Sequence, residues 1–294
     1  MGENVIELKN VCKKLKGFEI QNLSLEVKRG FVTGFIGPNG AGKSTTIKLI
    51  MNLLQPDYGE ISIFGMNYPK QAKEIKERIG FVYDDNVFYE NITLNEMKKI
   101  LKPSYKNWDD SLFYEYVERF ELPINKSIKT FSKGMMMKAS LVFALSHHAE
   151  LIVMDEPTSG LDPIFRRELL ELLHELMENG EKTIFFSTHN TTDLDRIADY
   201  IMHIHNGQHM FTKEIFKIEE EYAIVKGDLN LLDRDTEQEF IGIRKTNIGF
   251  EALTDNKNRT KKVFGDFVVM EKPTLEDIIF YTKKGDRNHV QSRS

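Results

Sequence analysis

Short apolar runs separated by polar turns open the chain and predict β-strands. They lie at residues 5–8, 23–27 and 31–36, with a further pair of strands at residues 59–64 and 79–83. A glycine-rich loop follows the third run, and residues 45–54 after it have the spacing of a helix. The first part of the chain therefore predicts several strands with one early helix.

Between about residues 90 and 148 the apolar residues recur every three or four positions among charged ones, which indicates helices. From residue 150 to residue 200 apolar strands and helices alternate, as in a parallel sheet with crossover helices. The pattern predicts an α/β domain at residues 1–212, with a helical subdomain inserted into its core.

The texture of the sequence changes near residue 212, and residues 213–294 predict a small α+β accessory domain. Strand-like pieces lie at residues 222–225 and 268–270. A helix is expected after Pro273, with Thr274 as its cap. A polar tail is expected from about Lys283.

The bulk composition limits the classes of partner. The chain has 294 residues, 40% of them apolar, and a formal net charge of −5, which gives no general reason to expect nucleic acid as a partner. The single cysteine, Cys12, excludes an intrachain disulfide and fits a reducing compartment. We see no signal peptide at the start and no run long enough to span a bilayer, so we expect a cytoplasmic protein.

One loop carries a phosphate-binding motif, G-x-x-x-x-G-K-[ST]. Its residues are Gly37, Pro38, Asn39, Gly40, Ala41, Gly42, Lys43, Ser44 and Thr45. Glycines let successive backbone N–H groups point inward around a phosphate. Lys43 is expected to contact the β- and γ-phosphates and Ser44 to bind Mg²⁺. The preceding strand and the following helix give the motif its usual setting. The fold is therefore expected to have a P-loop NTPase core.

Two further strands end in polar residues that suit nucleotide hydrolysis. Residues 151–154 are apolar and lead into Asp155 and Glu156. Such a buried strand brings its acids to the sheet edge where phosphates bind. Asp155 is predicted to hold Mg²⁺ through a water and Glu156 to polarise the attacking water, the alternative being a solvated turn or a helix cap. His189 ends the strand at residues 183–188; it either contacts the γ-phosphate or is a turn residue.

Residues 131–135 read Phe-Ser-Lys-Gly-Met and resemble a variant of the L-S-G-G-Q signature of ABC ATPases. Residues 159–162, which end in Asp162, resemble the D-loop of this family, and His189 resembles its switch histidine. The whole order of motifs covers roughly residues 5–210. The resemblance implies the ABC ATPase fold, with an antiparallel β subdomain at the N-terminus.

The resemblance also implies a mode of action. Two subunits would close head-to-tail around two molecules of ATP with Mg²⁺, each signature helix covering the nucleotide held by the other phosphate loop. Ser132 and Gly134 lie where a helix start favours an anion, and Asp162 joins them as a nucleotide-binding residue. The partner is expected to be a second copy of this chain or a different ABC ATPase, giving a homodimer or a heterodimer.

Some positions depart from the family pattern. Asp84 stands where the family has a glutamine and is either a further Mg²⁺ ligand or part of a polar interface loop. The family also has an aromatic residue that stacks on adenine, but Leu15 or Lys16 stands at that position in this chain. Phe18 is the candidate to replace it. A metal site at His203 and His205 is disfavoured because the Asn-Gly pair that comes next predicts a hairpin.

The main functional hypothesis is an ATPase subunit that powers a membrane exporter of peptides, lipids or drugs. It rests on resemblance, because the signature and the C-terminal domain of this chain are similar to those of such exporter ATPases. It requires a separate transmembrane permease and a peripheral position on the inner face of the cell membrane, with no nucleic acid as partner. The alternatives are a soluble ABC ATPase acting on ribosomes or DNA, and a kinase. The single cassette without sustained heptads disfavours the former, and the signature and D-loop disfavour a kinase.

Overall fold

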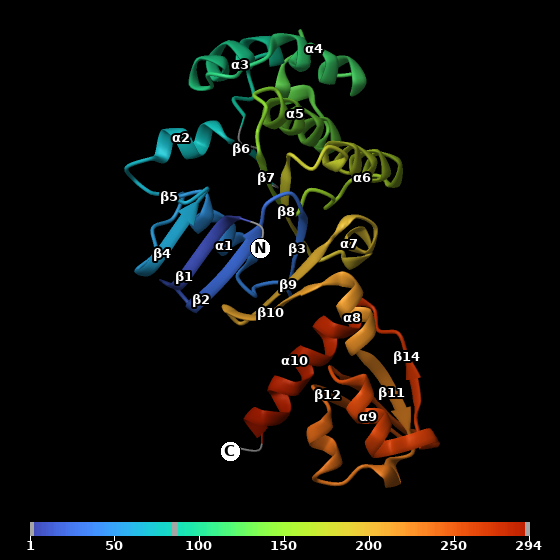
Figure 1. Ribbon diagram of the computed structural model, residues 1–294. Helices are drawn as coiled ribbons and strands as arrows, with labels where there is room; N and C mark the ends of the chain where they lie inside the picture. The colour runs from blue at the N-terminus through green and yellow to red at the C-terminus, as the bar shows by residue number, and fades with distance from the viewer. Residues whose placement is uncertain (1–2, 84–87, 292–294) are drawn as a thin grey trace. The chain divides into compact units, whose positions relative to one another are not determined.

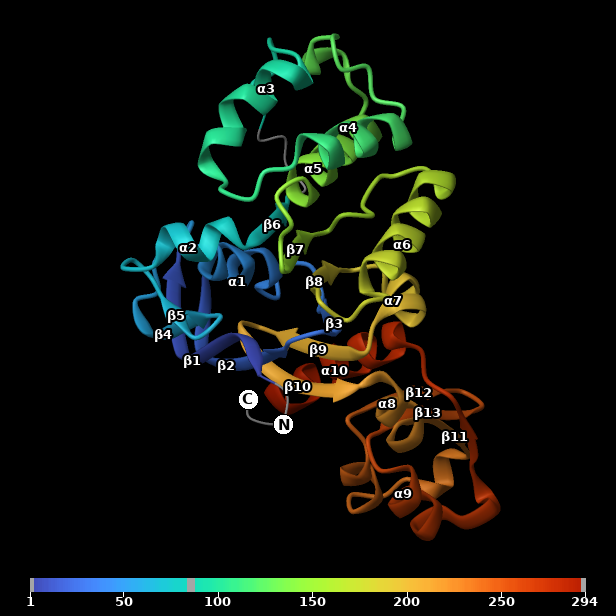
Figure 2. The same ribbon diagram turned by 45° about the horizontal axis from the view of Figure 1, so that its top comes forward.

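The computed structural model describes residues 3–83 and 88–291, with side chains described as far as residue 284. Its contacts divide the chain into two compact units, Met1–Thr212 and Lys213–Ser294. Figures 1 and 2 show the ribbon from two directions. Among the described residues, no helix has the length and apolar character needed to cross a membrane.

An antiparallel sheet begins the first unit, with strand order β2-β1-β4-β5. Its strands are β1 (Asn4–Leu15), β2 (Phe18–Lys28), β4 (Tyr58–Ile63) and β5 (Met66–Asn67). Along β2 the residues Ile20, Leu23, Leu25 and Val27 are buried, whereas those between them are exposed. This sheet therefore has one face in the core, as the early apolar alternation predicts.

The central sheet has the order β10-β9-β3-β8-β7-β6. Its strands are β3 (Val32–Ile36), β6 (Ile79–Val82), β7 (Leu151–Asp155), β8 (Thr183–Thr188), β9 (Tyr200–His205) and β10 (Gln208–Glu214). The strands from β9 to β6 run parallel. Every residue of β3, β7 and β8 is buried, which explains their continuous apolar runs.

Helices connect these strands: α1 (Lys43–Ile50), α2 (Ala72–Glu77), α6 (Pro163–Met177) and α7 (Thr191–Ile197). Two expectations differ from the structure. The runs at residues 59–64 and 79–83 do not pair, because β4 pairs with β1 and β6 pairs with β7. Helix α1 begins two residues earlier than the spacing predicts, because it starts directly from the phosphate loop.

The inserted helical subdomain contains α3 (Leu94–Leu101), η1 (Lys102–Ser104), α4 (Asp110–Arg119), η2 (Ile128–Thr130) and α5 (Lys133–Leu145). Capping side chains fix where the helices start. Thr93 and Glu96 form a capping box at α3, and Asp109 caps α4 by accepting from the backbone of Ser111 and Leu112. Phe113 and Phe143, with ring centroids 5.7 Å apart, join α4 to α5.

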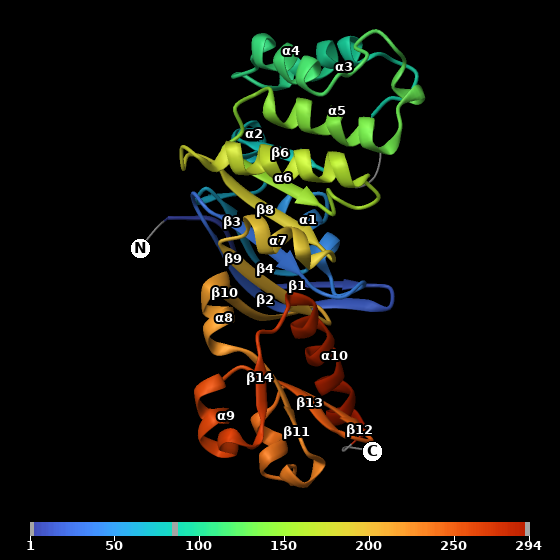
Figure 3. The ribbon, with the colours of Figure 1, turned by 90° about the vertical axis from the view of Figure 1, so that its right-hand side faces the viewer.

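The second unit has an antiparallel sheet of order β12-β13-β11-β14. Its elements are α8 (Ile215–Glu221), β11 (Ala223–Gly227), η3 (Leu229–Leu231), η4 (Thr236–Glu239), β12 (Gly242–Thr246), β13 (Gly249–Thr254), α9 (Lys257–Phe264), η5 (Gly265–Phe267), β14 (Val269–Glu271) and α10 (Leu275–Gln291). Phe240, Phe250 and Phe264 pack together in its core. Figure 3 shows α9 and α10 on opposite sides of this sheet.

Helix α10 starts where the sequence predicts, since the Thr274 hydroxyl accepts a hydrogen bond from the backbone of Asp277 at 3.1 Å. The expected polar tail, from about Lys283, begins within this helix. The helical backbone continues to Gln291. A polar segment joined to an anchored helix can propagate it, because each added residue gains one backbone hydrogen bond.

Glu150 holds the amino ends of three segments of the first unit together. Its carboxylate accepts from Arg78 Nε at 2.6 Å and Nη2 at 2.9 Å, and from Arg29 Nη2 at 2.6 Å. Arg78 directly precedes β6, Glu150 directly precedes β7, and Arg29 lies just before β3. The hydrogen bonds from Arg78 lower the pKa of Glu150. This cluster therefore fixes the strand starts on the edge opposite the polar strand ends.

We predict that Glu150→Gln destabilises the protein at pH 7 by about 0.5–1 kcal/mol, since solvent partly screens the pair. A lowered folded-state pKa contributes stability above the unfolded value of about 4.3. That contribution disappears as the pH falls through the folded-state pKa, so the difference from wild type must shrink toward about pH 3. Urea unfolding at both pH values measures it. Glu178→Gln, which alters an exposed glutamate outside the ion pairs of the described residues, is the control; a difference that does not change with pH would contradict the assignment.

Candidate active site

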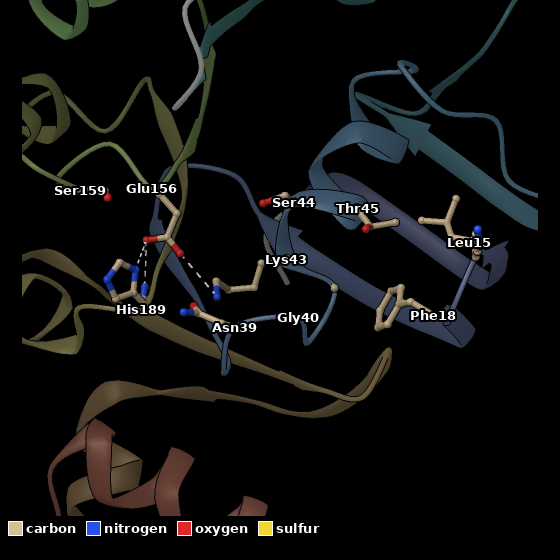
Figure 4. Close-up of a pocket in the computed structure, with 13 residues that line it drawn as sticks. Leu15, Phe18, Asn39, Gly40, Lys43, Ser44, Thr45, Glu156, Ser159 and His189 are labelled. Atoms are coloured by element: carbon tan, nitrogen blue, oxygen red, sulfur yellow. Dashed lines mark hydrogen bonds and ion pairs between the residues drawn. The ribbon is translucent and has the colours of Figure 1, made fainter. Parts of the chain in front are cut away.

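A cavity of about 700 Å³ opens beside the phosphate loop (Figure 4). The turn between β1 and β2, the phosphate loop and the ends of two central strands supply its walls. The residues that line it are Leu15, Lys16, Gly17, Phe18, Asn39, Gly40, Gly42, Lys43, Ser44, Thr45, Glu156, Ser159 and His189. Most of the predicted phosphate-loop residues therefore face one cavity.

The phosphate loop is packed tightly against strand β9. A Cβ atom on Gly37 would lie 2.3 Å from the carbonyl oxygen of Ile204, so only glycine fits at this approach. The Lys43 ammonium donates to the Gly37 carbonyl at 2.8 Å, and its side chain is only 6% exposed. This contact curls the loop back over the start of α1. The first N–H groups of α1 have no acceptor within the helix, which suits an anion.

Asp155 is the last residue of β7 and is buried. Its Oδ1 accepts from the Ser187 hydroxyl at 2.6 Å, and it also hydrogen-bonds to the Ser44 side chain. Burial raises the pKa of Asp155, and these two hydrogen bonds oppose the rise. A buried carboxylate beside a serine hydroxyl is an oxygen donor set that fits Mg²⁺.

Glu156 contacts the phosphate-loop lysine and the histidine together (Figure 4). Its Oε1 lies 3.4 Å from Lys43 Nζ, and its Oε2 lies 2.6 Å from His189 Nδ1 and accepts from the His189 backbone N–H at 3.1 Å. The Glu156 backbone has φ = 50°, an unusual value for a residue other than glycine. Such strain persists where surrounding contacts fix the residue, and here it directs the carboxylate into the cavity.

Ser187 was not singled out from the sequence, yet it joins both acids. Its hydroxyl donates to Asp155 and accepts from the Glu156 backbone N–H at 3.2 Å. Its sequence signal is a polar residue directly after the apolar run at residues 184–186 of β8. Ser159 was noted only as part of the D-loop, and it lines the cavity four residues after Asp155.

Three predicted nucleotide-binding residues lie elsewhere. Ser132 caps α5, its hydroxyl accepting from the Met135 backbone at 3.2 Å, and Gly134 lies in the first turn of that helix. Asp162 caps α6 by accepting from the backbone of Ile164 and Phe165. None of the three is among the described residues that line the cavity. Asp84, the predicted further metal ligand, lies outside the described residues.

The structure also shows where the candidates for adenine stacking and the histidines of β9 lie. Leu15, Lys16 and Phe18 line the cavity near Thr45, so Phe18 is available to a base. His203 and His205 are buried in β9, and the turn after them joins β9 to β10. In the part of the chain that the structure describes, no group of three or more His, Cys, Asp or Glu side chains could hold a metal ion.

The β9–β10 turn supports the phosphate loop, a contact that the sequence motifs do not indicate. The Gly207 N–H donates to the Ala41 carbonyl at 2.9 Å, and the Gly207 carbonyl accepts from Gln21 at 3.1 Å. Gly207 has φ = 74°, and a Cβ there would lie 1.9 Å from the carbonyl of Glu19. The turn thus links the phosphate loop to β2.

Comparison with known proteins relates the chain to one family. A family model described as "ABC transporter" matches residues 20–159. The chain is 37% identical over 193 residues to the bacitracin transport ATP-binding protein BcrA of Bacillus licheniformis, covering 64% of this chain and 62% of that protein. It is 32% identical to the ABC transporter ATP-binding protein NatA of Bacillus subtilis, covering 64% and 79%.

A second BcrA, from Enterococcus faecalis, is 32% identical and covers 70% of this chain and 68% of that protein. Among solved structures, the ATP-binding subunit of an ABC transporter has a TM-score of 0.67 and 29% identity, covering 74% of this chain and 92% of that one. A dimeric ATP-binding cassette bound to ADP and Pi has a TM-score of 0.64 and 25% identity, covering 71% and 98%.

We predict that Gly207→Ala lowers the stability by about 2–3 kcal/mol, because it adds a clash to an unfavourable φ. It should also weaken nucleotide binding, since the link to Ala41 is displaced. Thermal unfolding and nucleotide titration measure the two effects. Gly180→Ala is the matched control, because Gly180 has φ = 67° with no heavy atom within 4 Å of an added Cβ. Equal losses in the two variants would show that close packing at Gly207 is unimportant.

Proposed function

The chain belongs to the ATP-binding subunits of ABC transporters, an ATPase family, and we propose that it powers an exporter of peptides, lipids or drugs through a separate permease. The observation that carries the hydrolytic part is Glu156, held between Lys43 and His189 in the lining of the cavity. The names of the transport relatives support the transporter part, and they give no support to a soluble ATPase acting on ribosomes or DNA.

The phosphate loop binds the triphosphate of ATP in this proposal. Residues 37–45 surround the phosphates with backbone N–H groups, and Lys43 brings a buried positive charge to the β- and γ-phosphates. Phe18, on the far wall of the cavity, is the side chain available to stack on adenine. The positive end of α1 adds to the attraction for phosphate.

Ser44 and Asp155 are the residues that would hold Mg²⁺, with Asp84 as a further ligand in the proposal. Bound Mg²⁺ offsets the charge of the β- and γ-phosphates. Asp155 is buried and hydrogen-bonded to Ser187, so its carboxylate is held in place without the ion. A fixed oxygen ligand reduces the reorganisation needed on binding.

Glu156 polarises the attacking water, and His189 holds that water against the γ-phosphate. The water oxygen attacks phosphorus, the bond to the β-phosphate oxygen breaks, and Glu156 accepts the proton that the water loses. With Glu156 as a carboxylate, His189 Nδ1 must donate in their hydrogen bond of 2.6 Å. The contact between Glu156 and His189 therefore orients both groups.

The site needs a second subunit, because the signature residues Ser132 and Gly134 and the D-loop Asp162 lie outside this chain's own cavity. The N-terminus of α5 is a helix start with no acidic residue in its first turn, which favours an anion. In the proposal it covers the γ-phosphate bound to the opposite subunit, and the partner is a second copy or a related chain. The residues 213–294 form an accessory domain, and the ATPase unit, residues 1–212, docks on a permease at the inner face of the cell membrane.

We predict that Glu156→Gln lowers kcat by about 10²-fold or more while ATP affinity stays near wild type, because only the proton acceptor is lost. ATP should then trap a dimer, and adding Ser132→Ala should abolish that dimer. Lys43→Ala should instead weaken ATP binding itself. Phosphate release, ATP titration and size-exclusion chromatography measure these effects. Full-speed hydrolysis by a strict monomer would contradict the shared site.

For the wild-type protein, ATP at about 100 times its Kd should raise the free energy of unfolding by about 2.7 kcal/mol.

Coupling to transport predicts that ATP hydrolysis rises several-fold when the chain is reconstituted in liposomes with the membrane protein encoded beside it. The Glu156→Gln variant should remain inactive in the same liposomes, which excludes a contaminating ATPase. Stimulation by RNA or DNA, retained at moderate salt, would favour the ribosome or DNA alternative instead.

A further inference from the structure

A side-chain network outside the cavity links the helix after the D-loop to the loop that holds His189. Arg166 lies in the first turns of α6, four residues after Asp162. Its Nε donates to Asp193 Oδ1 at 2.6 Å, and its Nη2 donates to the Thr192 hydroxyl at 2.8 Å. Asp193 and Thr192 belong to the first turn of α7.

The network continues to the residue beside His189. The Thr192 hydroxyl donates to Asn190 Oδ1 at 2.8 Å, and the Asn190 backbone N–H donates to the Thr188 hydroxyl at 2.9 Å. Asn190 precedes α7 but, within the described residues, its side chain caps no N–H of that helix. The start of α7 is therefore held by Arg166 across the two helices rather than by a local cap.

Asp193, in the central pair of this network, is buried, and its partner Arg166 is half-buried. The Asp193 side chain is 1% exposed and that of Arg166 is 30% exposed, so water screens their attraction less than at the surface. An Asp193 carboxylate without its partner would be strongly unfavourable there. By contrast, the neighbouring Arg167 pairs with Glu171 on the same helix, and their side chains are 75% and 58% exposed. The first pair constrains geometry, whereas the second is an ordinary surface pair.

We propose that Arg166 is a positioning residue for hydrolysis, which holds the His189 loop so that His189 meets Glu156. This inference rests on the proposed roles of Glu156 and His189. It also gives the D-loop a physical connection to the site, because Asp162 caps the same helix that carries Arg166. Contact between Asp162 and a second subunit is thereby transmitted through α6 to the position of His189.

A positioning role for Arg166 predicts a slower chemical step with unchanged ATP binding, which a purely structural role would not. It does not line the cavity that takes the nucleotide, so its loss leaves ATP binding intact. Its loss frees the histidine loop, so the rate of the chemical step falls. Lysine in its place keeps a charge for Asp193 but presents one ammonium in place of the fork that also reaches Thr192.

The test compares Arg166→Ala, Arg166→Lys and the matched control Arg167→Ala with wild type. We expect Arg166→Ala to lower kcat about tenfold or more with Kd and KM for ATP within about twofold, Arg166→Lys to restore part of the rate, and Arg167→Ala to match wild type. Equal kcat values for Arg166→Ala and Arg167→Ala would overturn the proposal, as would a parallel loss of ATP binding.

Two additions keep the result decisive. If Arg166→Ala does not fold, Thr192→Val removes the hydroxyl that accepts from Arg166 and donates to Asn190, keeps the Arg166–Asp193 pair, and should still lower kcat. A wild-type rate would overturn the proposal. The ring signals of His189 in NMR spectra, assigned with His189→Gln, should shift in Thr192→Val and not in Arg167→Ala. This readout needs no turnover, so an inactive wild type would contradict the proposed function alone, and unchanged ring signals would contradict the role of the network.

Discussion

The contacts of Glu156 with Lys43 and His189 join the carboxyl ends of three neighbouring strands. Lys43 is the first residue of α1, which follows the phosphate loop after β3. His189 directly follows β8, Glu156 directly follows β7, and these strands lie side by side in the order β3-β8-β7. The register of the parallel strands brings these three side chains together, since Ile36 pairs with Thr188 and Asp155 pairs with Ser187. A shift of one residue in any strand would turn its side chains to the other face and separate the three groups.

The sequence alone identifies most of this site because each part is a short motif at the end of an apolar run. Strand ends of a parallel sheet meet at one edge, so the motif residues Lys43, Asp155, Glu156 and His189 could be grouped before the fold was known. The contacts among these side chains could not be predicted in the same way. The bridge that Ser187 makes between the two acids depends on the pairing of β7 with β8, which no local pattern encodes.

The less predictable parts of the fold have weak local signals. The sequence does not predict strands β12 and β13, because Arg244 and Lys245 place charges in the exposed part of β12 and Glu251 interrupts the apolar residues of the largely buried β13. Likewise, β4 and β6 have similar apolar runs but join different sheets, since pairing is decided by distant partners. The Asn-Gly turn after β9 was recognised as a hairpin, whereas its contact with the phosphate loop at Ala41 became evident only in three dimensions.

The proposed division of the chemistry between two subunits requires that contact with the partner be sensed where ATP is split. Asp162, the last residue of the D-loop, caps α6, and Arg166 lies four residues later on this helix, where it is joined to α7. A helix transmits displacement because its backbone hydrogen bonds make it stiff over such a distance. In the proposed mechanism the pair of half-buried Arg166 and buried Asp193 resists separation, so α6 and α7 would move together and carry the His189 loop with them. On this proposal, hydrolysis depends on the same helix that Asp162 caps.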